Sequence, residues 1–495
     1  MNILFNFVVR IQKYMRLLFF ISALLISSWS IAQPGYQLQF KINGLKDTIV
    51  YLGHFYGEAT YIKDTAQVNG VGEFVFEGKN TLRQGVYFLV LGKNKQFDFL
   101  MGHDQHFSMA TDRKDYIQNM RVTGDEDNKL FFENMIFNKE RYMEAEPYTK
   151  IIQDSTLAEE KKTEARKAYS KINEKVVGYQ DELVKKHPTT LTARILKSNQ
   201  PVVVPAPPKK ADGSIDSTFQ LRWYREHFFD HMDLADDAFL QMPKPIYRDK
   251  INEYLDKLFI QQPDSLTKAV DKIVSKAKKN QETYKYAVWT SISKYQQPEI
   301  MGLDAIYVNL YDKYFATGEM DFWVNDKMKK NLKEHADRLR KSLVGKTGPN
   351  LIMQDANLKP RSMYDIKNKY TVLFIFDPDC GHCKTETPVL VSLYNKKKFD
   401  VEVYAVSADT SMAKMRDYIK EMNMKWITVN GPRTYVGPYQ DLYDAITTPS
   451  LYVLDSKKKI IGKKIPADKL EEFLIHYEKF QKERELMKSK ASTKS

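Results

Sequence analysis

The chain has 495 residues, of which 43% are hydrophobic and 28% are charged. Because a domain usually holds about 100 to 200 residues, this length predicts two or three domains, each with its own core. The formal net charge is +13, from 76 basic and 63 acidic residues. Acidic residues accompany the basic ones almost everywhere along the chain, so the excess indicates a soluble basic surface and argues against a nucleic-acid-binding protein.

The N-terminal segment has the pattern of a secretory signal peptide. Basic residues precede an apolar run at 17–26, and Ser30-Ile31-Ala32 then supplies small residues at the two positions that a signal peptidase reads. We expect cleavage after Ala32, which would remove residues 1–32 on export. The apolar run is shorter than the roughly 20 residues of a membrane span, and Gln33 stands where a lipoprotein has cysteine. The sequence therefore predicts a location in the periplasm or cell envelope.

Residues 33–123 are predicted to form a β domain. Apolar and polar residues alternate at 36–42, and Asn43-Gly44 then supplies a turn. Similar short runs follow at residues 48–52, 73–76, 86–91 and 96–100. This spacing of short strands and turns is typical of a small antiparallel sheet or sandwich.

Residues 124–340 are predicted to form an all-α domain. Apolar residues recur at helical spacing within 251–258 and again within 270–277. The stretch at 201–208 holds four prolines, which cannot continue a helix. We expect an extended loop at this stretch, with helices resuming near Phe219.

Residues 345–487 alternate between strand and helix patterns and are predicted to form an α/β domain. Predicted strands lie at 371–376, 401–406, 451–454 and 460–464, and predicted helices begin at Cys383, near Met412 and at Ala467. This order indicates a sheet covered by helices on both faces. The basic tail at 488–495 is predicted to be disordered.

The two cysteines of the chain, Cys380 and Cys383, enclose Gly381 and His382. Two cysteines exclude a disulfide framework and a four-cysteine zinc or iron-sulfur site. The pair follows an apolar strand and opens a helix, so unpaired N–H groups and the helix dipole would stabilise a thiolate at Cys380, and His382 would add a potential positive charge. Cys380 is therefore the predicted nucleophile, and Cys383, one turn further inward, is the predicted resolving thiol.

Other chemistries fit the cysteine pair less well. A structural disulfide across two residues would constrain little of the unfolded chain, and a zinc site would have only His382 nearby in sequence. Covalent haem attachment requires a histidine at the position of Lys384. Peroxidase chemistry of the peroxiredoxin type requires threonine at the position of Asp377.

The segment CGHCKTETP at 380–388, followed later by Thr448-Pro449, resembles the thioredoxin fold and its TlpA/ResA-like periplasmic subgroup. Pro388 matches the proline that kinks the active-site helix of this family. Glu386 matches the carboxylate that ResA-like members place after the second cysteine, and Pro449 matches the family's cis-proline. The resemblance covers about residues 345–487.

This resemblance implies an exported thiol-disulfide oxidoreductase that exchanges electrons with protein substrates. Cys380 would attack, Cys383 would resolve and Glu386 would relay protons. The backbone of Thr448 would pair with the substrate polypeptide like an added strand. The positions expected to contact substrate are Gly381, His382, Thr448 and Pro449. No metal and no organic cofactor is implied, since the redox-active group is the cysteine pair itself.

The implied partners are protein thiols and disulfides of the envelope. A reductant of this class would also need a membrane electron donor, and a homodimer is expected by analogy with disulfide isomerases. The front two-thirds of the chain resembles envelope proteins in which a β domain and a helical domain precede a thioredoxin-like domain, and this similarity names no chemistry. The alternative function is therefore an envelope binding or scaffolding protein with an accessory thioredoxin-like domain.

Three positions depart from the family pattern. Phe374 stands six residues before Cys380, where thioredoxins keep a buried aspartate for proton transfer. Asp379 replaces the usual tryptophan, and its negative charge would oppose thiolate formation. The Gly381-His382 dipeptide is that of disulfide isomerases, which are more oxidising than thioredoxin, so the direction of electron flow is left open.

Overall fold

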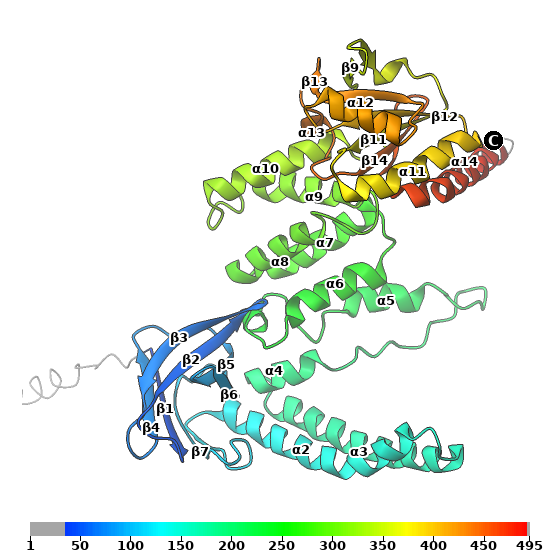
Figure 1. The fold of residues 1–495 in the computed structure, drawn as a ribbon. Coiled ribbons are helices and arrows are strands. Elements are labelled where there is room, and N and C mark those ends of the chain that lie inside the picture. The colour runs from blue at the N-terminus through cyan, green and yellow to red at the C-terminus, as the bar shows by residue number, and fades with distance from the viewer. Residues whose placement is uncertain (1–34, 493–495) are drawn as a thin grey trace, which may run out of the picture. The chain divides into compact units, whose positions relative to one another are not determined.

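The computed structural model describes residues 35–492, and its elements follow the predicted order of strands, helices and a mixed sheet (Figure 1). The predicted multidomain fold class, with an N-terminal β part, a middle α part and a C-terminal α/β part, is confirmed. The predicted signal peptide lies outside the described residues. Within 35–492, no helix is long and apolar enough to cross a membrane.

The chain packs as two compact units. The first runs to Asn252 and includes residues 276–283, and the second comprises residues 253–275 and the chain from Tyr284 onward. The predicted helical region at 124–340 therefore contributes to both units.

The strands of the first unit form two sheets of four strands each. In order across the first sheet lie β4 (Glu73–Gly78), β1 (Tyr36–Asn43), β7 (His106–Asp112) and β8 (Arg121–Thr123). Across the second lie β3 (Ala59–Gln67), β2 (Ile49–Tyr56), β5 (Gly85–Leu91) and β6 (Asn94–Met101). Inward side chains of both sheets, among them Phe40, Phe76, Leu52, Leu89 and Phe99, pack into one core, as in a β-sandwich.

Two features of this sandwich differ from the sequence prediction. The predicted sheet is antiparallel throughout, but β1 pairs in parallel with β7, because the chain passes through the second sheet before it returns to the first. The strands β3, β7 and β8 are missing from the prediction. In β3, seven of nine side chains are exposed, so this strand lacks the alternation of buried and exposed residues that reveals a strand.

Four helices follow the sandwich in the first unit: α2 (Glu126–Gln153), α3 (Glu159–Lys186), α4 (Leu191–Ser198) and α5 (Phe219–His227). The helix α2 begins where the carboxylate of Asp125 accepts a hydrogen bond of 2.8 Å from the Asn128 N–H. The proline-rich stretch at 201–208 is not helical, and α5 starts at Phe219, as predicted.

The helices α6 (Ile246–Leu258), α7 (Pro263–Ala277) and α8 (Gln281–Lys294) contribute residues to both units. The second unit continues with α9 (Asp304–Leu310), a short π-helical turn at Tyr311–Phe315 and α10 (Asp326–Lys341). The predicted helical spacing at 251–258 and 270–277 is confirmed by α6 and α7.

The C-terminal part of the second unit is built on a sheet of seven strands. In order across the sheet lie β10 (Pro360–Ser362), β9 (Ile352–Asp355), β13 (Ile427–Thr434), β12 (Val401–Ser407), β11 (Tyr370–Phe376), β14 (Ser450–Asp455) and β15 (Ile460–Lys463). The central strand β11 is parallel to β12 and antiparallel to β14. The strand β13 is missing from the prediction because Gly431-Pro432 interrupt its pattern and its register shifts after Asn430.

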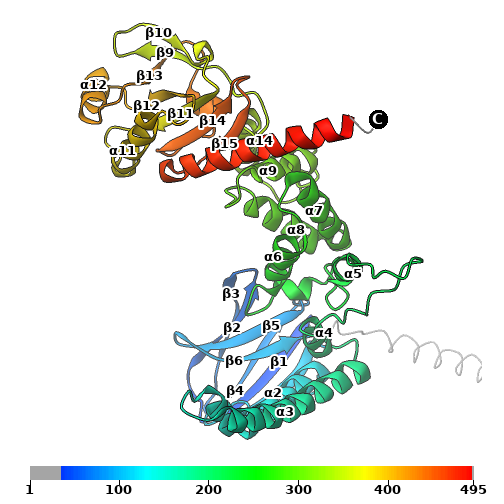
Figure 2. The same ribbon diagram turned by 90° about the vertical axis from the view of Figure 1, so that its right-hand side faces the viewer.

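Both faces of this sheet are covered. Phe374 and Phe376 of β11 pack with α11 (Gly381–Lys396) and α14 (Leu470–Ser492), which lie beside the sheet in Figure 2. On the opposite face, Leu373 packs with residues of and around α13 (Tyr439–Leu442). The helix α14 continues to Ser492, so the prediction of disorder from Lys488 onward is wrong for residues 488–492, where no proline or glycine interrupts the helix. Residues 493–495 lie outside the described residues.

A buried ion pair joins the helical segment of the second unit to its sheet. Lys463 of β15 contacts the carboxylate of Asp304, the first residue of α9, and their side chains are only 4% and 6% exposed. The backbone N–H of Lys463 also donates to the Met301 sulfur at 3.1 Å. The adjacent Lys464 forms an ion pair of 2.8 Å with Asp444, before β14. The sheet therefore meets α9 at Lys463, and Lys464 ties the end of β15 to the loop before β14.

Candidate active site

The two cysteines lie at the junction of β11 and α11. After β11 ends at Phe376, a tight turn forms in which the Asp377 carbonyl accepts a hydrogen bond of 3.1 Å from the Cys380 N–H. Cys380 is the N-cap residue of α11, and its sulfur accepts a hydrogen bond of 3.4 Å from the Cys383 N–H. The predicted placement of Cys380 at a helix N-terminus is confirmed.

The environment of Cys380 favours a thiolate. Its sulfur is partly exposed and lies 3.4 Å from the carbonyl oxygen of Thr448. Partial burial acts to raise the pKa of Cys380, but hydrogen bonds with Cys383, with Thr448 and with the His382 N–H together lower this pKa below its ordinary value. Cys380 is thus both accessible and activated.

Cys383 has the opposite environment. Its side chain is fully buried in an apolar cluster with Phe376, Leu390 and Tyr418. Burial is the main reason that the pKa of Cys383 rises to about 12, although the Asp377 N–H donates a hydrogen bond of 3.4 Å to its sulfur. Of the two thiols, only Cys380 is therefore poised to attack a substrate from solvent.

The loop before β14 faces Cys380. The peptide bond between Thr448 and Pro449 is cis, the geometry that the sequence predicts, and both residues are partly exposed. The contact between the Cys380 sulfur and the Thr448 carbonyl places this loop directly beside the nucleophile. A substrate cysteine bonded to Cys380 would thus lie within reach of exposed backbone groups.

The remaining predicted residues lie on the first turns of α11. Gly381 and His382 are exposed, and nothing lies within 4 Å of the position that a side chain at Gly381 would take. Glu386 is half-buried, and its carboxylate accepts a hydrogen bond of 3.1 Å from the Ala467 N–H, where the segment before α14 begins. This contact ties α11 to the segment that leads into α14. The role of Glu386 as a proton relay stays a prediction.

Two hydroxyl groups near the buried thiol are not found by the sequence analysis. The Tyr418 and Thr387 hydroxyls form a buried hydrogen bond of 2.8 Å, and Tyr418 belongs to the same cluster as Cys383. Burial chiefly raises the pKa of Tyr418 to about 12. Phe374, at the position where thioredoxins keep an aspartate, is fully buried in that cluster. The polar groups of this interior are therefore uncharged at neutral pH.

Lys414 offsets the negative charge beside the nucleophile. The carboxylates of Asp377, Asp379 and Asp409 lie within 4.8 Å of one another. Lys414, on α12 (Met412–Glu421), reaches Asp379 at 2.6 Å and Asp409 at 3.3 Å. The aspartate that is expected to oppose the Cys380 thiolate is thus held in an ion pair, which the sequence analysis does not reveal.

We expect Lys414→Ala to raise the pKa of Cys380 by a fraction of a unit, at most about one unit, because the carboxylates next to the thiolate lose their counter-ion. The pH profile of Cys380 alkylation by iodoacetamide would shift to higher pH. Asp379→Asn should shift the profile in the opposite direction. Lys420→Ala, an exposed lysine on the same helix, is the matched control. A profile for Lys414→Ala that coincides with that control would contradict this interpretation.

Comparisons with known proteins agree with this geometry. Residues 344–463 match the AhpC/TSA family. Residues 36–131 and 215–338 match two families described as domains of unknown function, DUF4369 and DUF5106. The chain is 26% identical over 125 residues to the thiol-disulfide oxidoreductase ResA of Bacillus cereus, covering 25% of this chain and 70% of that protein.

Two solved structures are also similar to parts of this chain. A domain of a possible thiol-disulfide isomerase from Cytophaga hutchinsonii is 38% identical, with 28% of this chain and 96% of that chain covered and a TM-score of 0.26. A thioredoxin-like protein from Bacteroides caccae is 18% identical over 56% of this chain and 99% of that chain, with a TM-score of 0.40. Residues 344–463 therefore form an AhpC/TSA-type, thioredoxin-like domain that is similar to the ResA thiol-disulfide oxidoreductases.

Proposed function

We propose that the protein is exported and exchanges its Cys380/Cys383 dithiol or disulfide with protein substrates in the cell envelope. The observation that carries this proposal is the unequal environment of the two thiols. Cys380 is partly exposed with a lowered pKa, whereas Cys383 is buried with a pKa raised to about 12. This asymmetry fits a pair in which one thiol attacks from the surface and the other acts only after a mixed disulfide has formed.

The exchange proceeds in two balanced steps. The Cys380 thiolate attacks one sulfur of a substrate disulfide, so that a Cys380–substrate disulfide forms and the second substrate sulfur leaves as a thiolate. The Cys383 sulfur then attacks Cys380, which forms the Cys380–Cys383 disulfide and releases the first substrate sulfur. The substrate gains two electrons from the dithiol, and the proton of Cys383 passes to a product thiolate. With an oxidised protein and a dithiol substrate, the same steps run in reverse.

The Thr448–Pro449 loop would hold the substrate backbone beside Cys380 during both steps. Its support is the 3.4 Å contact between the Cys380 sulfur and the Thr448 carbonyl, which brings exposed backbone groups next to the reacting atom. A polypeptide that pairs with this loop would present its cysteine to Cys380 in a fixed orientation.

The reduction potential of the pair tests the proposal and sets its direction. The mature protein, beginning at Gln33, would be equilibrated with glutathione buffers, and free thiols would be trapped and counted. A potential near or below about −250 mV would make the protein a reductant that needs a membrane electron donor. A potential near about −180 mV or above would make it an oxidant or isomerase. A pair that forms no disulfide in any of these buffers would overturn the proposed chemistry.

Export is tested separately. The native host should release a chain whose N-terminal residue is Gln33, as read by mass spectrometry, and this chain should fractionate with the envelope. An intact Met1 in a cytoplasmic fraction would contradict the proposed location. Light scattering of the same mature protein decides whether it forms the expected homodimer.

A further inference from the structure

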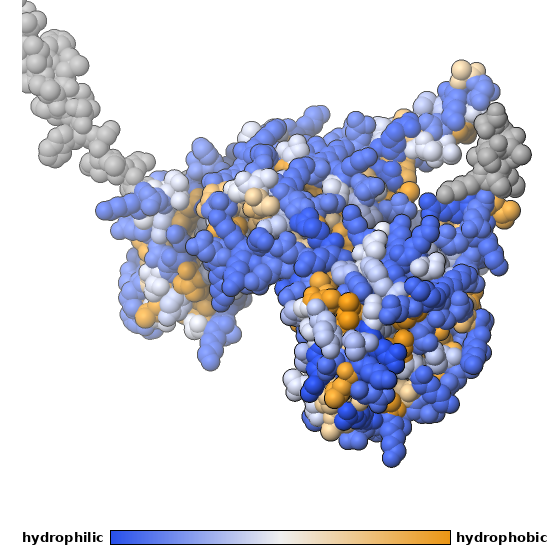
Figure 3. Space-filling model, turned by 90° about the horizontal axis from the view of Figure 1, so that it is seen from above, coloured by the Kyte–Doolittle hydropathy of each residue, from blue (hydrophilic) through white to orange (hydrophobic). Residues whose placement is uncertain are grey.

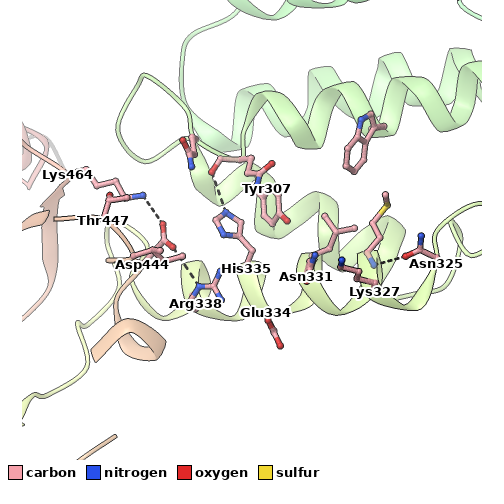
Figure 4. A pocket seen from close by; sticks show the side chains of 16 residues that line it. Tyr307, Asn325, Lys327, Asn331, Glu334, His335, Arg338, Asp444, Thr447 and Lys464 are labelled. Carbon is pink, nitrogen blue, oxygen red and sulfur yellow. Dashed lines mark hydrogen bonds and ion pairs between the residues drawn. The ribbon is translucent and has the colours of Figure 1, made fainter. Parts of the chain in front are cut away.

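A hollow lies beside the Thr448–Pro449 loop, between that loop and the helices α8 and α10 (Figure 4). We infer that this hollow holds the stretch of substrate polypeptide that flanks the cysteine bonded to Cys380. The inference rests on the proposed function and assigns it a substrate class: extended or unfolded polypeptides rather than small disulfides. It also gives the helical segment before residue 344 a direct role in substrate selection.

The hollow reaches the residue that precedes the Thr448–Pro449 loop. Its larger part has a volume of about 610 Å³, and a neighbouring part has a volume of about 300 Å³. Thr447 and Lys464 line both parts. The residue after Thr447 is Thr448, whose carbonyl contacts the Cys380 sulfur at 3.4 Å. The hollow therefore begins one residue along the chain from the residue that contacts the nucleophile.

The walls of the hollow carry exposed apolar side chains. Trp289 and Ile446 line the larger part and are 36% and 65% exposed, and Ile300 and Met301 line the smaller part and are 46% and 40% exposed. The face of the molecule seen in Figure 3 is mostly hydrophilic, with hydrophobic patches between hydrophilic residues. Apolar side chains of an unfolded substrate would be removed from water by contact with these walls.

The polar residues of the hollow fit a peptide backbone better than a charged ligand. Side-chain amides are supplied by Gln296, Gln297, Asn325 and Asn331. An amide both donates and accepts hydrogen bonds, so it can pair with peptide N–H and C=O groups of any sequence. The buried carboxylate of Asp444 is already paired with Lys464 at 2.8 Å and with Arg338 at 3.9 Å (Figure 4). Lys327 and Glu334 also line the hollow, so charges of both signs are present there.

The test measures how fast a variant is oxidised by two disulfide substrates of different length. Asn331 is exposed on α10 and lines the hollow, so Asn331→Trp would fill it without touching the dithiol. The full mature protein, pre-reduced, would be mixed with excess oxidised glutathione or with the disulfide-linked dimer of a 12-residue peptide whose cysteine is central. Acid quenching and alkylation would give the second-order rate constant of Cys380/Cys383 oxidation for each substrate.

We expect Asn331→Trp to lower the rate constant for the peptide disulfide about tenfold and to change that for glutathione less than about twofold. Ile446→Asp, which places a charge among the apolar walls, should have the same selective effect. Lys425→Trp adds an indole to a separate hollow of the same unit and is the matched control. An unchanged reduction potential in all variants would show that the dithiol is intact.

The outcomes separate this inference from the proposed function. If Asn331→Trp and Ile446→Asp slow neither substrate, slow both equally, or behave like Lys425→Trp, the hollow does not hold the polypeptide. If Asn331→Trp fails to fold, its rate constants fall with both substrates and its reduction potential changes. The rate constants of Ile446→Asp then test the inference. If the unmodified protein reacts with neither disulfide, the proposed function itself fails.

Discussion

Replacing Cys380 by serine is expected to abolish disulfide exchange, whereas Cys383→Ser is expected to stop the reaction at a stable mixed disulfide. The first variant lacks the exposed nucleophile, and the second lacks the thiol that releases the substrate. Incubation of each variant with a disulfide-linked peptide, followed by intact-mass spectrometry without reductant, would show an adduct on Cys383→Ser and none on Cys380→Ser.

The same variants test the electrostatic difference between the two thiols. With a pKa of about 12, Cys383 would be a thiolate in roughly one molecule in 10⁵ at pH 7. Iodoacetamide should therefore alkylate the single thiol of Cys380→Ser at least about 100-fold more slowly than the single thiol of Cys383→Ser. The alkylation rate of Cys380 should rise with pH and level off below the pH expected of an ordinary cysteine, because its pKa is lowered. Equal alkylation rates at neutral pH would refute the assigned roles.

Replacing Asp304 by alanine is expected to destabilise the second unit by about 3 kcal/mol or more. The substitution leaves the Lys463 ammonium buried without its counter-ion, and the loss of one partner from a buried ion pair costs far more than the pair itself contributes. Urea unfolding followed by tryptophan fluorescence would measure the effect, because Trp289, Trp323 and Trp426 all lie in this unit.

Two controls separate the buried charge from other causes. The double variant Asp304→Leu/Lys463→Met removes both charges and should recover most of the lost stability. Asp337→Ala removes the partner of Lys333 in an exposed pair on α10 and should leave the unfolding midpoint nearly unchanged. If Asp304→Ala is no less stable than Asp337→Ala, the pair of Asp304 and Lys463 does not join the helices to the sheet.

The parts of the site that the sequence predicts are those encoded locally. Cys380 and Cys383 are three residues apart, and the apolar strand before them fixes the helix start that follows. The loop at Thr448–Pro449 is far away in sequence, but a threonine-proline pair before an apolar strand marks it. Four of the seven strands of the C-terminal sheet are predicted, because central strands such as β11 and β14 are buried on both faces and read as continuous apolar runs.

The contacts that escape the sequence analysis join residues far apart along the chain. Lys414 pairs with Asp379 across 35 positions, and Glu386 reaches the Ala467 N–H across 81 positions. No local pattern marks either contact, because each depends on how α11 packs against α12 and α14. The hollow beside Thr447 has the same origin, since its walls come from helices and from a loop that no periodicity connects.

Asp444 anchors the start of the loop that ends at Pro449. The Asp444 N–H donates to the Ser342 hydroxyl at 3.3 Å, its carbonyl accepts a hydrogen bond of 3.1 Å from the Tyr452 hydroxyl, and its carboxylate is paired with Lys464. The start of this loop is therefore ordered when the protein folds, before any substrate arrives. A polypeptide that binds there does not have to restrict the conformational entropy of the loop, so more of its contact energy remains as affinity.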